Sequence, residues 1–87
     1  MYKLHWRKSV SRSLLDECAR ADKLLRDAIL EAMAEVEEIL HDEPEFAGES
    51  RDPGKRFLIV KPLSITYKID HRSRTVLVVD VRIHRKR

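Results

Sequence analysis

The last ten residues of the chain, VVDVRIHRKR, hold side chains that are well suited to chemistry on a phosphate. Arg82 and His84 are separated by one residue, so in a strand they lie on the same face, opposite Val81 and Ile83. An imidazole can give or take a proton near neutral pH, and a guanidinium binds a phosphate through two parallel N–H groups. This spacing predicts a site that acts on a phosphodiester. A solvated histidine without a role is the simpler alternative for His84.

Cleavage of RNA without a metal ion uses the ribose 2′-hydroxyl as the nucleophile. It needs a group that takes the hydroxyl proton, a group that protonates the leaving oxygen, and cations that stabilise the charge at phosphorus. If the chain cuts RNA in this way, His84 and Arg82 are the candidates for its catalytic residues. The candidates for binding RNA phosphates are the basic residues Arg51, Lys55, Arg56, Lys68, Arg85 and Lys86.

The cysteine and histidine content gives no sign of a metal site. The four histidines and Cys18 show no metal-ligand spacing, so we expect no metal and no cofactor. A single cysteine cannot form an internal disulfide, which favours a reduced, cytoplasmic setting. No apolar run is long enough to span a membrane, and the N-terminus MYKLHW lacks the apolar core of a signal peptide.

The charges are distributed unevenly along the chain. Residues 1–50 contain seven Lys/Arg against twelve Asp/Glu, whereas residues 51–87 contain eleven Lys/Arg against three Asp/Glu. Such an asymmetry indicates an anionic partner for the second half, with nucleic acid as the first candidate. A solvated charged surface without a partner is the alternative.

The first half of the sequence predicts a strand followed by helix. Residues 2–7 alternate between apolar and polar, which is typical of a half-buried strand, and the serines of SVSRS are candidate N-caps. Apolar residues then recur with a period near 3.6 from Leu14 to Leu40. This pattern permits one long helix or a break near Arg20–Asp22 with Asp22 as a second N-cap. The helix should end near His41–Glu43, because Pro44 disfavours helix at the residue before it.

The second half predicts three strands. Residues 44–54 read as a loop that ends in a type II turn, with Gly54 at the position that requires a positive φ. Residues 55–60 are apolar without alternation, which predicts a strand buried on both faces or covered at one end. Residues 63–70 and 75–84 alternate, and a polar turn joins them.

We therefore predict an α+β fold in which the helices pack on one face of an antiparallel sheet. Helix residues Leu14, Leu25, Ile29, Val36 and Ile39 are expected to pack onto Leu4, Trp6, Ile65, Tyr67, Leu77 and Val79. The other face is then open and presents Lys3, His5, Arg7, Ser64, Thr66, Lys68, Asp80, Arg82 and His84. A slip of one residue in the alternation would bury these side chains instead.

Several passages resemble the RelE/ParE superfamily, the toxins of bacterial type II toxin–antitoxin modules. They are the Trp that closes the first strand, the DEP…GESR passage, and KRFLIVKPLSITYKID…RTVLVVDVRI, in this order of elements. The resemblance covers nearly the whole chain and implies a single domain over residues 1–87. It implies a helical hairpin on a curved, mostly antiparallel four-stranded sheet, which favours the break near Arg20–Asp22.

The resemblance also implies an activity and partners. The RelE-like branch cuts mRNA in the ribosomal A site, the ParE-like branch inhibits DNA gyrase, and an antitoxin holds both inactive. His84 stands where such nucleases carry an Arg or His that contacts the scissile phosphate, but Ser64 stands where many have Arg, and the late Tyr is missing. The leading prediction is a metal-independent, ribosome-dependent mRNA endoribonuclease with a cognate antitoxin. The alternatives are a non-enzymatic gyrase inhibitor and a member that keeps only antitoxin binding.

Overall fold

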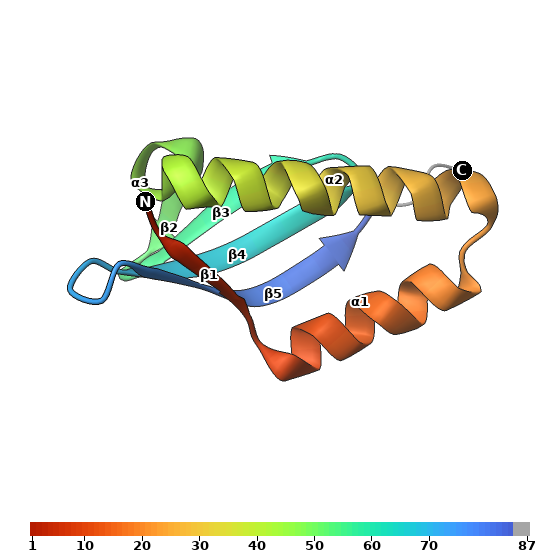
Figure 1. Ribbon diagram of the computed structural model, residues 1–87, viewed down its shortest axis with the longest axis horizontal. Helices are drawn as coiled ribbons and strands as arrows, with labels where there is room; N and C mark the ends of the chain where they lie inside the picture. Colours follow the sequence, from red (N-terminus) through yellow and green to blue (C-terminus); the bar gives the residue numbers. More distant parts are fainter. Residues whose placement is uncertain (85–87) are drawn as a thin grey trace.

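A five-stranded mixed sheet forms the base of the molecule (Figure 1). The computed structural model describes residues 1–84, except for the side chain of Asp52. In space the strands follow the order β1-β5-β4-β3-β2; β1 pairs with β5 in parallel and the other neighbours are antiparallel. The strands are β1 (Lys3–Trp6), β2 (Glu49–Asp52), β3 (Lys55–Val60), β4 (Leu63–Asp70) and β5 (Thr75–Ile83). The α+β class is confirmed, but the prediction of four strands is wrong, because β2 adds a fifth.

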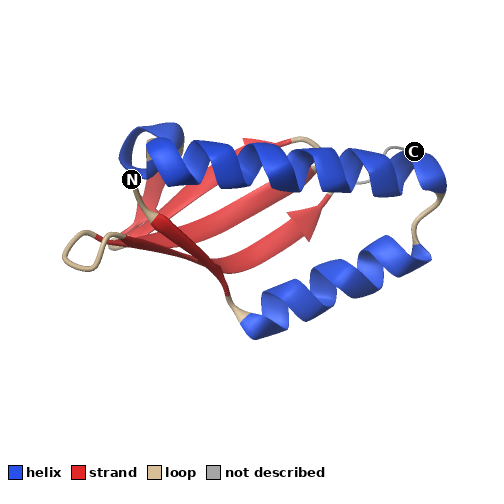
Figure 2. Ribbon diagram, in the orientation of Figure 1, coloured by secondary structure: helices blue, strands red, loops and turns tan. Residues whose placement is uncertain are grey.

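Two long helices and one short helix contribute to the same core (Figure 2). They are α1 (Lys8–Arg20), α2 (Lys23–Asp42) and α3 (Pro44–Ala47). The break between α1 and α2 lies where Asp22 was expected to cap, and its carboxylate accepts a hydrogen bond of 2.9 Å from the Leu25 N–H. The expected serine caps are wrong: α1 begins at Lys8, and the N-cap residue Arg7 makes no side-chain cap bond.

The segment predicted as a loop, residues 44–54, contains regular structure. Pro44 opens α3, where its missing N–H has no cost, and β2 then pairs antiparallel with β3. Gly48 allows the close approach of these parts, because a Cβ there would lie 2.6 Å from the Phe57 carbonyl oxygen and 2.8 Å from the Tyr67 hydroxyl. Gly54 has φ +80°, as the predicted turn requires.

A β-bulge at Val79 changes which side chains of β5 face the helices. Tyr67 pairs with Val78 and Thr66 pairs with Asp80, so Val79 is an extra residue between two pairs. Before the bulge, Val76 and Val78 are fully buried; after it, Val81 and Ile83 pack against the core. The predicted core positions Leu77 and Val79 are therefore wrong, because a single uninterrupted alternation was assumed through residues 75–84.

Strand β3 is covered on one face only. Leu58 and Val60 are buried, whereas the side chain of Ile59 between them is 56% exposed. The prediction that β3 is buried on both faces is therefore wrong, because only the face turned to the helices is buried. The remaining expected contacts hold: Leu14, Ile29 and Val36 are buried in one cluster with Ile65 and Tyr67.

The bulge predicts that truncating two adjacent valines lowers the free energy of unfolding by different amounts. Val78→Ala should lower the free energy of unfolding by about 1.5–3 kcal/mol, because Val78 is fully buried. Val79→Ala should cost less than about 1 kcal/mol, because Val79 lies outside the core cluster. Urea denaturation of both variants measures the difference. Equal losses, or a larger loss at Val79, would contradict the bulged register.

Candidate nucleic-acid interface

The face of the sheet turned away from the long helices is called the outer face here. Cross-strand pairing places its side chains in rows: Ile59 pairs with Ser64 and Ser64 with Arg82, while Phe57 pairs with Thr66 and Thr66 with Asp80. Residues paired directly across a sheet share a face. The outer face includes Lys3, His5, Phe57, Ile59, Ser64, Thr66, Lys68, Leu77, Asp80 and Arg82, and His84 follows at the end of β5.

Ser64, Arg82 and His84 form a group that we call the His84 cluster. The Ser64 hydroxyl is hydrogen-bonded to His84 Nε2, and the His84 backbone N–H donates to the Pro62 carbonyl oxygen over 2.7 Å. Ser64 is only 4% exposed, whereas His84 and Arg82 are exposed. Arg82 lies 3.8 Å from the Asp80 carboxylate, which orients the guanidinium. The structure thus brings together the two residues that were predicted as catalytic.

Arg51 and Phe57 form a flat platform on the same face. The guanidinium carbon of Arg51 lies 4.9 Å from the centroid of the Phe57 ring, and a second contact of 3.7 Å joins Arg51 to Glu49. Planar cationic and aromatic groups of this kind are suited to stacking on nucleic-acid bases. Sequence reasoning missed Phe57 and Ile59, because the run FLIV is apolar throughout and does not reveal which side chains face outward.

The other predicted phosphate-binding residues differ in their placement. Lys68 is exposed on the outer face, directly opposite Leu77, which is in turn opposite His5. Lys55 is half-buried and shares the face of Phe57 by alternation along β3. Arg85 and Lys86 lie outside the described residues.

Arg56 is turned to the helix-covered face instead. It pairs directly with the buried Tyr67, and its guanidinium donates a hydrogen bond to the Gly48 carbonyl oxygen. The Tyr67 hydroxyl donates a 2.6 Å bond to the Pro44 carbonyl oxygen. Burial raises the pKa of the Tyr67 phenol, and the Arg56 guanidinium opposes that rise. Arg56 therefore holds α3 and β2 to the sheet, and the structure does not bring it to the His84 cluster.

A second group of titratable side chains lies at the turn between β4 and β5, at the other end of β5 from His84. The Tyr2 hydroxyl donates a hydrogen bond of 2.9 Å to the Glu45 carboxylate, and His71 lies 3.7 Å from the same carboxylate. The bond to Glu45 raises the pKa of the Tyr2 phenol. This group ties the N-terminus, α3 and the turn together.

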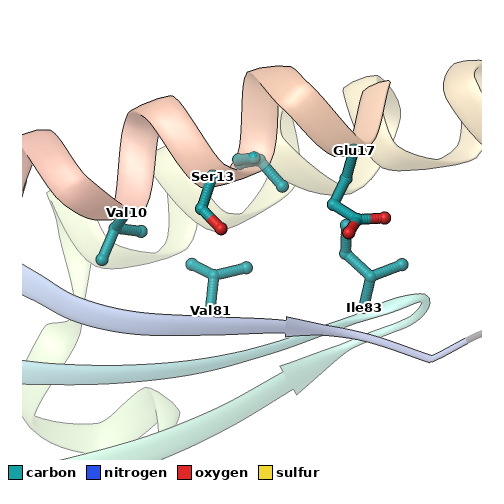
Figure 3. A pocket seen from close by; sticks show the side chains of 6 residues that line it. Val10, Ser13, Glu17, Val81 and Ile83 are labelled. Carbon is teal, nitrogen blue, oxygen red and sulfur yellow. The ribbon is translucent and has the colours of Figure 1, made fainter. Parts of the chain in front are cut away.

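A cleft of about 220 Å³ lies between α1 and β5, on the helix side of the sheet. Figure 3 shows Val10, Ser13 and Glu17 of α1 facing Val81 and Ile83 of β5 across it. Its lining combines four aliphatic residues with Ser13 and Glu17 and contains none of the cations of the outer face, so it does not extend the His84 cluster.

Within residues 1–84 no group of three or more His, Cys, Asp or Glu side chains is arranged to hold a metal ion. In the same part of the chain, no helix has both the length and the apolar character needed to cross a membrane. Cys18 is free and buried in the core, as its helical position predicts.

The placement of Arg56 predicts a role in stability. Arg56→Ala should lower the free energy of unfolding by about 1.5–3 kcal/mol, because the Gly48 carbonyl loses a charged donor. The matched control Arg51→Ala should cost less than about 1 kcal/mol, since Arg51 is exposed and contacts the face of one ring. Thermal or urea unfolding separates the two. Equal stabilities would refute the structural role of Arg56.

Comparison with solved structures identifies the fold. No protein-family model matches the sequence, and a search of curated protein sequences finds no match. A chain of the RelBE toxin–antitoxin complex from Mycobacterium tuberculosis is 20% identical with a TM-score of 0.69, covering 95% of this chain and 91% of that chain. The isolated E. coli RelE toxin is 16% identical with a TM-score of 0.65, covering 100% and 88%. A chain of the archaeal RelE–RelB complex from Pyrococcus horikoshii is 13% identical with a TM-score of 0.63, covering 99% and 98%. The chain has the RelE-like toxin fold.

Proposed function

We propose that the protein is the toxin of a type II toxin–antitoxin module and cleaves mRNA on the ribosome without a metal ion. The observation that carries this proposal is the His84 cluster: an exposed imidazole, held through one ring nitrogen, beside an exposed guanidinium on a RelE-like fold. Both side chains lie on a face whose neighbouring strands carry further cations. We place the reaction on this outer face.

The reaction is a transesterification within the RNA strand. The 2′-hydroxyl oxygen attacks the adjacent phosphorus and gives its proton to water, the bond from phosphorus to the 5′-oxygen breaks, and that oxygen receives a proton. The products are a 2′,3′-cyclic phosphate and a 5′-hydroxyl. His84 donates the proton to the leaving oxygen, and Arg82 stabilises the charge at phosphorus. The ribosome aligns the 2′-hydroxyl with the phosphorus and so contributes much of the rate.

The rest of the outer face binds the RNA around the reacting phosphate. Phe57 and Arg51 stack on a base, and Phe57 lies two strands and two residues from Arg82, roughly 12 Å away. Lys68 contacts a phosphate farther along the sheet. The outer face is therefore wide enough to hold more than one nucleotide.

A cognate antitoxin is the second partner that we propose, in a cytoplasmic setting. Two of the similar structures are chains from complexes of RelE with RelB or of the RelBE type. The exposed cations Lys68 and Arg82 favour an antitoxin segment that is rich in Asp and Glu, because complementary charge steers association and excludes other partners. Such a segment would cover the same face that binds RNA.

The exposed Ile59 favours a second candidate, a non-enzymatic inhibitor of DNA gyrase. Its side chain is 56% exposed in the middle of the outer face, where an apolar contact suits a protein surface. In this alternative the same face binds a protein, and His84 has no catalytic role. A member that binds only its antitoxin is the third alternative. The experiment below distinguishes these functions.

Cleavage should depend on His84 and Arg82 in different ways. His84→Ala should lower the rate of mRNA cleavage by about 10²–10⁴-fold, because the general acid is lost. Arg82→Ala should weaken RNA binding and reduce its dependence on salt, because one phosphate contact is gone. Induced expression of each variant, with parallel measurement of growth, mRNA cleavage and DNA supercoiling, tests both.

Lys23→Ala on the exposed surface of α2 serves as the matched control and should leave cleavage unchanged. Full toxicity and cleavage in the His84→Ala protein would refute a catalytic His84. Growth arrest with altered supercoiling and intact mRNA would establish the gyrase alternative instead.

A further inference from the structure

Ser64 stands out because it is polar, buried and directed at the candidate catalytic residue. Its side chain is 4% exposed, and its hydroxyl is hydrogen-bonded to His84 Nε2. Among residues 1–84 no other side chain or backbone group is hydrogen-bonded to this hydroxyl or to His84 Nδ1. A buried hydroxyl without a partner costs free energy, so the pairing with His84 is the contact that Ser64 requires.

We propose that Ser64 is a positioning residue that sets which nitrogen of His84 transfers the proton, an inference that rests on the proposed function. Because Ser64 holds Nε2, Nδ1 is the nitrogen left for the substrate. His84 is held at two points, because its ring is hydrogen-bonded to Ser64 and its backbone N–H donates to the Pro62 carbonyl oxygen over 2.7 Å. Ser64 pairs across the sheet with Arg82, so the guanidinium and Nδ1 serve the same phosphate.

A hydroxyl is suited to this task because it can both donate and accept a hydrogen bond. In the neutral ring the Ser64 hydroxyl has no other acceptor among residues 1–84, so it donates to Nε2 and the ring proton resides on Nδ1. In the imidazolium, Nε2–H donates to the same oxygen after the hydroxyl rotates. When Nδ1 then gives its proton to the leaving 5′-oxygen, the bond from Nε2–H to Ser64 is unchanged. The ring therefore keeps its position during proton transfer, and exchange of protons with water afterwards returns the ring to the Nδ1–H form.

An arginine at position 64 could not act in this way. A guanidinium only donates hydrogen bonds and remains charged, so it has no lone pair for Nε2–H and repels an imidazolium. Serine at this position and histidine at the end of β5 are compatible with each other for that reason. Ser64 stands where many similar nucleases carry Arg, and this difference is therefore no argument against catalysis in this chain.

The test compares three variants in two measurements. Ser64→Ala removes the hydroxyl, Ser64→Thr keeps it, and Ser9→Ala removes an exposed hydroxyl from α1, away from the outer face, as a control. Long-range ¹⁵N–¹H NMR of the unbound protein at about pH 8.5, where an ordinary imidazole is neutral, reports which nitrogen of His84 carries the proton. Single-turnover cleavage of mRNA on purified ribosomes reports the rate and the half-saturating toxin concentration separately.

We expect the Nδ1–H form of His84 in the wild type, Ser64→Thr and Ser9→Ala proteins, and the Nε2–H form in Ser64→Ala. The maximal rate of Ser64→Ala should fall at least tenfold with an unchanged half-saturating concentration, and Ser64→Thr should restore it. The same tautomer in wild type and Ser64→Ala, or equal maximal rates, would overturn the positioning role. A tautomer change as expected, in a wild-type protein that cleaves no mRNA, would overturn the proposed function and leave the orientation of His84 by Ser64 established.

Discussion

The β-bulge at Val79 is the constraint on which the rest of the structure depends. Val76, Val78, Arg82 and His84 all have the same parity along β5, so in a regular strand they would share one face. The first two are fully buried and the last two are exposed, which is possible only because the extra residue reverses the alternation between them. The bulge thus permits a closed core under α2 and a cationic outer face in one strand.

The same reversal determines where the helices can pack. After the bulge, Val81 and Ile83 turn toward α1 and line the cleft with Val10 and Leu14. Without it, Asp80 and Arg82 would point into this apolar region, where an unpaired charge is strongly unfavourable. The placement of Arg82 and His84 on the outer face and the packing of α1 are therefore not independent. Both depend on the bulged pairing of β4 with β5.

Structural features that depend on neighbouring residues were predicted better than features that depend on the pairing of distant segments. The residue pattern allowed a break with Asp22 as N-cap beside one long helix, and the resemblance to the RelE/ParE superfamily favoured the break. The turn at Gly54 was predicted because a positive φ is a local requirement. The bulge could not be predicted, since TVLVV is apolar on both sides and gives no phase. Strand β2 was missed because its polar residues become a strand only by pairing with β3.

The candidate site shows the same difference between features within one segment and contacts between segments. Alternation could group Arg82 with His84 because one residue separates them, with Arg82 in β5 and His84 directly after its end. It could not show that Ser64 binds His84, or that Arg56 turns away from the outer face to the Gly48 carbonyl, because both contacts join separate segments. The burial of Ser64 was likewise not evident, because alternation grouped Ser64 with Thr66 and Lys68 on the open face.

The acidic first half and the basic second half of the chain place opposite charges on different surfaces of the molecule. Glu31, Glu35 and Glu38 line a shallow surface of α2, whereas Lys68 and Arg82 are exposed on the outer face. A polyanion would therefore be attracted to the outer face of the sheet and repelled by the acidic surface of α2, which would orient the molecule before any specific contact forms. This polarity agrees with a site at the end of β5.

The chemistry at the ends of mRNA fragments tests the central claim most directly. Fragments isolated from cells during growth arrest by this protein should carry a 2′,3′-cyclic phosphate, or the 3′-phosphate formed by its hydrolysis, on one side of the cut. The other side should carry a 5′-hydroxyl, because the proposed reaction uses the 2′-hydroxyl as the nucleophile and His84 as the acid that protonates the leaving 5′-oxygen. Fragments with 5′-phosphate ends, or arrest with intact mRNA, would contradict the account.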